Sequence, residues 1–139
     1  MRSLVHSIRL RHIVVLTTAC LLLACKSDET VVAYGAASQK WTLVEINDLP
    51  APSPATLTFP ETGWIAGQAA CNSYRATMDV PYPWFETGPI LATKSICPEI
   101  AAETAFLAAL AEMTLSEVLG DTLILSTTDG RKLVFTTAG

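Results

Sequence analysis

From Lys40 onward, hydrophobic and polar residues alternate in short runs that are separated by turn residues. Aromatic and β-branched residues are frequent in these runs, which is typical of strands. The pattern predicts strands at Trp41 to Ile46, Thr56 to Phe59, Trp64 to Gly67 and Ile90 to Thr93. The prolines at positions 81 and 83 indicate a loop or an edge strand, because proline cannot donate a hydrogen bond to a neighbouring strand.

One run has helical spacing and predicts a helix from about Pro98 to Met113. Proline suits the first position of a helix, and Glu99 places a negative charge near the positive end of the helix dipole. Six alanines between positions 101 and 111 add helix propensity. Phe106 and Leu110 lie one turn apart, so we expect both to face the rest of the domain.

The last part of the chain predicts a hairpin. Two alternating runs, Thr122 to Ser126 and Lys132 to Thr136, are joined through Thr128-Asp129-Gly130-Arg131. Asp-Gly is a strong hairpin indicator, because both residues can adopt the positive φ that a tight turn requires.

The N-terminus has the pattern of an export signal. A basic head containing Arg2, Arg9 and Arg11 precedes an uncharged run from Ile13 to Cys25, which is too short for a membrane-spanning helix. Residues 1–24 are therefore predicted to be a signal peptide.

The tetrad Leu22-Leu23-Ala24-Cys25 resembles the lipobox of bacterial lipoproteins. The resemblance implies that Cys25 carries a diacylglycerol on its sulfur and becomes the first residue of the mature protein. An ordinary secreted protein with a chance cysteine near its cleavage site is the alternative. Lys26 follows in place of the aspartate that retains lipoproteins in the inner membrane, so we expect attachment to the outer membrane, facing the periplasm.

Removal of the signal changes the charge and the available chemistry. The whole chain has 9 basic and 13 acidic residues, and loss of the three signal-peptide arginines leaves a net charge of about −7. Nucleic acid is not expected as a partner, because its binding requires clustered Lys and Arg. Both histidines, His6 and His12, leave with the signal, which removes histidine bases and metal ligands. We therefore expect no catalytic residues, no metal and no cofactor.

The mature chain is short enough for a single domain. Residues 25–39 are mostly small and polar, so they are predicted to be the lipidated N-terminus and a flexible tether, with an edge strand at Val31 to Tyr34 as the alternative. Residues 40–139 are predicted to form the folded domain.

Several segments in this order resemble the META domain family, the family of the HslJ-like heat-inducible envelope proteins. The segments are Trp41-Thr42-Leu43, Gly67 to Tyr74 with Cys71-Asn72, Thr93 to Cys97, and Glu103 to Leu110. The resemblance implies an α+β fold, with a curved antiparallel sheet or partial β-barrel and one packed α-helix. It implies no defined activity, only an association with stress. Pro81 and Pro83 depart from the family pattern and leave the strand after Tyr74 open.

Two cysteines remain in the mature domain, Cys71 and Cys97. In an oxidising compartment such a pair is most simply a disulfide, which would stabilise the domain by roughly 3.5 kcal/mol in the chain-entropy model. Two buried free thiols are the alternative.

Three aromatic residues among the prolines, Tyr82, Trp84 and Phe85, are our candidates for a contact surface. Asn72 and Ser73 are interpreted as turn residues. Four carboxylates are interpreted as a solvated face: Glu99, Glu103, Glu112 and Glu117.

The sequence thus favours a non-catalytic binding or quality-control protein of the envelope. Its expected partners are the membrane, through the lipid on Cys25, and an envelope protein or small hydrophobic ligand. A structural envelope component without a specific ligand is the alternative. A deep apolar pocket would favour binding, whereas a filled core with flat surfaces would favour the structural role.

Overall fold

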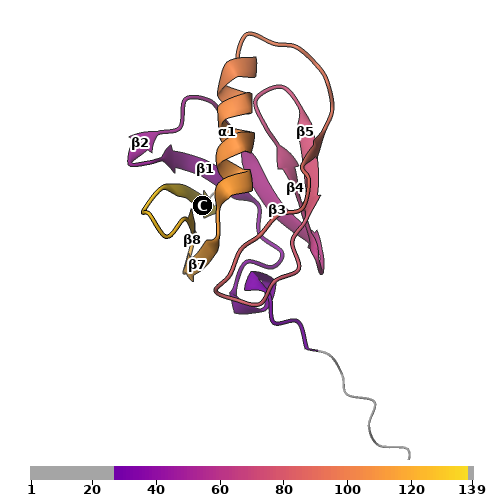
Figure 1. The fold of residues 1–139 in the computed structure, drawn as a ribbon, viewed down its shortest axis with the longest axis vertical. Coiled ribbons are helices and arrows are strands. Elements are labelled where there is room, and N and C mark those ends of the chain that lie inside the picture. The colour runs from indigo at the N-terminus through magenta and orange to yellow at the C-terminus, as the bar shows by residue number, and fades with distance from the viewer. Residues whose placement is uncertain (1–26, 138–139) are drawn as a thin grey trace, which may run out of the picture.

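A computed structural model describes residues 27–137, which form one α-helix, one 3-10 helix and a nine-stranded antiparallel sheet (Figure 1). The predicted signal peptide and Cys25 lie outside the described residues. The helices are η1 (Val31–Tyr34) and α1 (Ile100–Glu112). The strands are β1 (Trp41–Ile46), β2 (Leu49–Pro50), β3 (Thr56–Glu61), β4 (Trp64–Gln68), β5 (Ser73–Thr77), β6 (Leu91–Ala92), β7 (Leu115–Leu119), β8 (Thr122–Ser126) and β9 (Lys132–Thr137).

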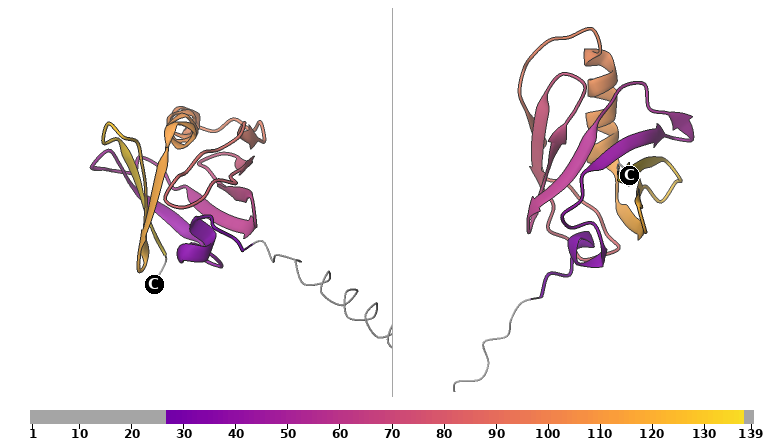
Figure 2. Two further views of the ribbon diagram at one scale, coloured as in Figure 1. Left: turned by 60° about the horizontal axis from the view of Figure 1, so that its bottom comes forward. Right: turned by 180° about the vertical axis from the view of Figure 1, so that it is seen from behind.

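The sheet has the order β6-β5-β4-β3-β1-β9-β8-β7, with β2 paired to β1 at its side. It bends where β1 meets β3, a junction of two residue pairs, and α1 lies across the inside of the bend (Figure 2). Within residues 27–137 the end strands β6 and β7 do not pair with each other, so the sheet stays open. The expected α+β class with a curved antiparallel sheet and one packed helix is confirmed.

The core fills the space between the helix and the bent sheet. Phe106 and Leu110 both face inward and are buried, as predicted. The Phe106 ring packs edge-on against Tyr74 of β5 and Phe135 of β9, with ring centroids 5.8 and 6.4 Å apart. One helix residue therefore joins the two sides of the bend.

Strand β5 forms in full, although the sequence left it open. Its residues alternate between exposed and buried, with Tyr74 and Ala76 inside. Pro81 and Pro83 follow the strand and lie in the loop before β6, so they interrupt no pairing.

Strand β7 was missed because one of its inward residues is polar. Ser116 is buried and donates hydrogen bonds through its backbone and its hydroxyl to the carbonyl of Pro83, at 2.7 and 3.3 Å. A serine at an inward position hides the alternation on which strand prediction depends.

The turns follow the chemistry of their residues. The predicted β8–β9 hairpin is confirmed, with positive φ at Gly130, 91°, but not at Asp129. Asn47 and Asp48, between β1 and β2, have φ of 51° and 65°, as two-residue hairpin turns require.

The prediction of a tether over residues 25–39 was wrong for Thr30 to Ala36, and the alternative edge strand was wrong as well. Val31 and Ala36 are fully buried, and the Trp41 indole N–H donates to the Ala36 carbonyl at 3.1 Å. Gly35 suits this position, because its φ of 113° favours glycine and a Cβ there would lie only 3.2 Å from the Val118 side chain. The small residues of this segment suggested a flexible chain, but here they allow it to pack closely against the domain.

Candidate functional site

The most connected polar side chain in the interior is Glu103 on α1, which is only 4% exposed. One carboxylate oxygen accepts the backbone N–H groups of Cys71 and Asn72, at 2.7 and 2.8 Å. The other accepts the side-chain amide of Asn72 at 2.6 Å. The carboxylate thus fastens the loop before β5 to the helix.

Asn72 extends this connection to a third segment. Its side-chain oxygen accepts the Thr93 hydroxyl at 2.7 Å and the Ser95 backbone N–H at 2.6 Å. Its side-chain nitrogen also donates to the Ser95 carbonyl at 3.0 Å. We refer to Cys71, Asn72, Thr93, Ser95 and Glu103 as the Asn72–Glu103 cluster.

The cluster keeps Glu103 ionised in spite of its burial. Burial raises the pKa of a carboxylate, but the three hydrogen bonds from Asn72 and Cys71 outweigh it and hold the Glu103 pKa below its usual value. A buried carboxylate with three donors and little exposure acts as a fastener.

The interpretation of Glu103 as part of a solvated face was therefore wrong, and that of Asn72 as a simple turn residue was incomplete. Glu99, Glu112 and Glu117 are exposed, as expected. Helical spacing separates Glu103 from Glu112, because Glu103 lies three and seven residues before Phe106 and Leu110 on the buried face. It does not separate Glu103 from Glu99, which falls on the same face by its spacing but precedes the first turn of α1 and is exposed.

The predicted disulfide between Cys71 and Cys97 forms, with Cα atoms 5.8 Å apart. It ties the loop that carries Asn72 to the residue just before α1. The alternative of two free buried thiols does not hold.

Other residues of the family pattern also fasten the fold. The Tyr74 hydroxyl donates to the Thr56 carbonyl at 2.7 Å. It can do so only because position 67 is glycine, where a Cβ would lie 1.9 Å from that carbonyl oxygen. The pattern Gly67, Cys71, Asn72, Tyr74 thus specifies contacts that hold the sheet and helix together.

The outer surface of the β4–β5 sheet carries an open groove of about 550 Å³, which we call the β4–β5 groove. Trp64, Arg75 and Leu91 line it, together with residues of β3, β4, β5 and the segment 91–93. The Arg75 guanidinium lies over the Trp64 ring, 4.1 Å from its centroid. Over residues 27–137, no ion pair involves Arg75. The groove is open and combines an aromatic surface, an aliphatic side chain, a cation and the carboxylate of Glu61.

The predicted contact surface is only partly exposed. Trp84 is 55% exposed, and Tyr82 is half-buried against Tyr34, with stacked rings 4.3 Å apart. Phe85 is buried, so its assignment to a contact surface was wrong. Its backbone N–H donates to the Thr114 carbonyl at 2.9 Å, which turns the side chain into the core.

Residues 27–137 contain no group of three or more His, Cys, Asp or Glu side chains placed to hold a metal ion. In the same part of the chain, no helix has the length and apolar character needed to cross a membrane.

Comparisons with known proteins agree with the geometry. Three solved structures share the fold. An NMR structure of a protein from Burkholderia xenovorans has a TM-score of 0.62 and 21% identity, over 78% of this chain and 87% of that chain. A second NMR structure has a TM-score of 0.56 and 17% identity, over 71% of this chain and 88% of that chain. A crystal structure of a DUF4847 family protein from Bacteroides vulgatus has a TM-score of 0.59 and 15% identity, over 78% of this chain and 97% of that chain. A search of curated proteins gives no match. The META domain model matches residues 35–139. The chain therefore belongs to the META domain family.

Proposed function

We propose that this META-domain protein is a lipid-anchored protein of the bacterial outer membrane that binds another envelope protein in the periplasm and performs no catalysis. Anchoring rests on the lipobox-like residues Leu22 to Cys25, and binding rests on the β4–β5 groove. A role in stress or quality control would follow from binding of partly unfolded proteins.

The β4–β5 groove is the observation that carries the binding role. Tryptophan and arginine are the residues that most often dominate protein interfaces, and here they stack on each other at the surface. Arg75 has no acidic partner among the described residues, in a chain with many more acidic than basic groups. An apolar segment with an acidic residue that pairs with Arg75 would fit this surface, which Glu61 also lines.

The edge strand β6 supports an extended protein segment as the ligand. It pairs with β5 on one side only, and Leu91 in it is 64% exposed. An extended segment can add to such an edge through backbone hydrogen bonds. A small hydrophobic ligand fits less well, because an open groove would bury only part of its surface.

We infer the absence of catalysis from the role of the polar residues in the interior, which hold the fold together. Each residue of the Asn72–Glu103 cluster is occupied in holding segments together. The mature chain has no histidine to activate a nucleophile.

Crosslinking in cells tests the binding role, and the chain offers a matched control. Leu91 on β6 and Leu49 on β2 are both exposed leucines on two-residue strands, 64% and 68% exposed. We expect a photoreactive residue at position 91 to capture a discrete envelope protein, and Arg75→Ala to weaken that capture. Position 49 should capture little.

A structural role remains the second candidate, because the core is filled and the groove is open. For that role, capture would be equally weak at positions 91 and 49 and insensitive to Arg75→Ala.

Anchoring is tested separately by Cys25→Ser, which should release the protein from the membrane fraction or leave it unprocessed. Normal processing and membrane retention of this variant would contradict the lipoprotein assignment.

A further inference from the structure

The chain just after the proposed lipid is fastened to the domain and cannot serve as a spacer. The Glu29 carbonyl accepts the Tyr82 backbone N–H at 2.7 Å. Asp28 accepts the backbone N–H of Thr30 at 2.9 Å and the Thr62 hydroxyl at 3.3 Å. Docking therefore begins at Asp28, three residues after Cys25.

Three residues of extended chain reach at most about 11 Å. A lipid on Cys25 would therefore hold the point where Asp28 docks close to the headgroups of the bilayer. A free tether from 25 to 39 would have let the domain tumble at a distance, whereas this short connection brings one end of the domain to the membrane.

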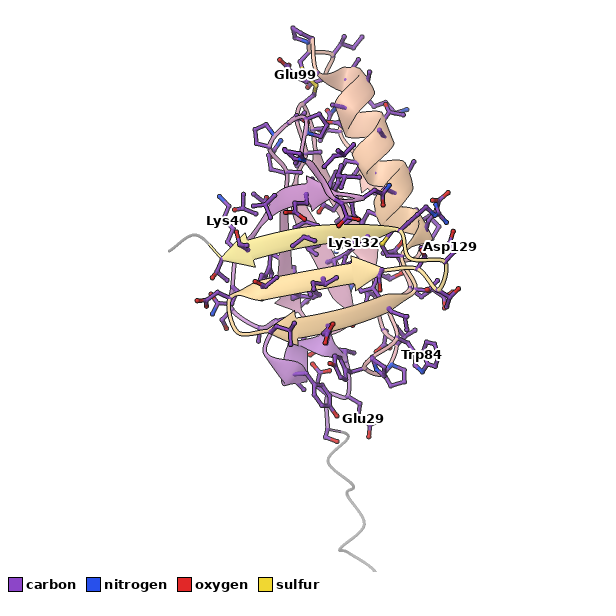
Figure 3. All side chains as sticks on the ribbon, turned by 90° about the vertical axis from the view of Figure 1, so that its left-hand side faces the viewer. Glu29, Lys40, Trp84, Glu99, Asp129 and Lys132 are labelled. Carbon is purple, nitrogen blue, oxygen red and sulfur yellow. A yellow bond between two sulfur atoms is a disulfide. The ribbon has the colours of Figure 1, made fainter. Side chains whose placement is uncertain are left out.

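Aromatic side chains are exposed at that end. Tyr34 is 56% exposed and stacks on Tyr82, whose backbone N–H bonds to Glu29. Trp84 is two residues further along and 55% exposed. Figure 3 shows Trp84 and Glu29 toward the same end of the molecule, with Glu99 at the start of α1 at the opposite end. We call Tyr34, Tyr82 and Trp84 the aromatic end.

Tryptophan and tyrosine favour the membrane interface, where the ring meets apolar chains and the polar atom stays hydrated. The charges nearby disfavour an electrostatic contact with anionic lipid. Residues 26–39 and 76–93 contain four acidic residues, Asp28, Glu29, Asp79 and Glu86, against one basic residue, Lys26. The headgroups that fit this surface are zwitterionic.

We propose that the aromatic end lies against the bilayer, with Tyr34 and Trp84 in the zwitterionic headgroup layer and the start of α1 directed away from the membrane. The proposal rests on the lipid at Cys25, and it adds a second membrane contact and a fixed orientation. It is independent of what the β4–β5 groove binds.

Fluorescence quenching of the full-length, processed protein tests the orientation. The protein is purified in detergent, its lipid is checked by mass spectrometry, and it is reconstituted into phosphatidylethanolamine–phosphatidylcholine vesicles that carry a nitroxide on the headgroup. Trp41 is buried in the core, whereas Trp64 and Trp84 reach the surface at different places. Trp84→Phe and Trp64→Phe are the matched variants.

We expect the vesicle nitroxide to quench the tryptophan fluorescence of the wild-type protein and of the Trp64→Phe variant. The Trp84→Phe variant should lose more than half of that quenching. Partial replacement with phosphatidylglycerol should reduce quenching rather than increase it. Protein that carries its lipid and floats with the vesicles, but shows equal quenching in both variants or none, would overturn the orientation alone. Protein without lipid on Cys25 would overturn both the orientation and the anchoring.

Discussion

The β8–β9 hairpin and the segment from Cys71 to Ile100 are held in place by different forces. The hairpin has five consecutive residue pairs, and its inward residues Leu123, Leu125, Leu133 and Phe135 are fully buried. The Cys71–Ile100 segment contains one strand of five residues and one of two, and the rest is irregular up to Ile100, where α1 begins.

The irregular segment depends on polar side chains and a covalent bond. Backbone groups outside regular pairing still need hydrogen-bond partners. Glu103 and Asn72 supply them at Cys71, Asn72 and Ser95, and the disulfide closes the segment. Apolar alternation is enough to hold a hairpin, whereas irregular chain must be fastened at specific points.

Phe106→Ala should have the largest effect, because its side chain packs between the two regions. Loss of a buried phenylalanine costs about 3–5 kcal/mol, a large share of a small domain's stability. Denaturant unfolding of the chain from Lys26 measures this change. Glu112→Ala is the control on the same helix, since its exposed ion pair with Arg131 contributes little. Equal midpoints for the two variants would contradict the docking of α1.

Removal of the disulfide should come next. The double variant Cys71→Ser, Cys97→Ser should lose about 3.5 kcal/mol in the chain-entropy model. Amide hydrogen exchange should accelerate more between residues 71 and 97 than in β8 and β9. Uniform acceleration in both regions would show that they unfold as one unit and that the comparison does not hold.

Glu103→Ala should cost somewhat less, about 2–3 kcal/mol, because it leaves buried donors of Cys71 and Asn72 unpaired. Glu99→Ala is the control, since Glu99 is exposed and makes no side-chain cap bond at the helix start. Chemical denaturation of both variants gives the difference. If Glu103→Ala is as stable as Glu99→Ala, the cluster is not the fastener that we describe.

The smallest expected effect is a loss of folding stability at acidic pH. The Glu103 pKa is lower in the folded protein than in the unfolded chain. Its contribution is therefore complete above the ordinary glutamate pKa of about 4.3 and is lost as pH falls through the folded value. One such proton changes stability by at most about 1.4 kcal/mol per pH unit.

Thermal or urea unfolding at a series of pH values below neutrality measures this dependence. Glu103→Gln should lose stability less steeply than wild type in the acid range, because the amide does not titrate. Parallel curves for the two proteins would show that folding does not lower the pKa of Glu103.

Much of the fold could be predicted from the chain, because strands and helices leave local periodic patterns. The positions of β1, β3, β4, β8, β9 and α1 agree closely with the alternating and helical runs. The Cys71–Cys97 pair followed from the number of cysteines that the predicted export would leave. The candidate site was predicted less well, since Glu103 was assigned to solvent and Phe85 to the surface. Helical spacing distinguishes Glu103 from Glu112 but not from Glu99, and no local pattern indicates where Phe85 packs.

By itself the sequence determined where the regular elements lie, which cysteines can pair and which family the pattern resembles, because spacing and residue type act over a few neighbours. Only the tertiary structure decided the environment of side chains whose partners are distant in the chain. Glu103 became buried because Cys71 and Asn72, more than thirty positions away, bring donors to it. Thr30 to Ala36 became part of the domain because Trp41 and Val118 offer a surface against which small residues pack.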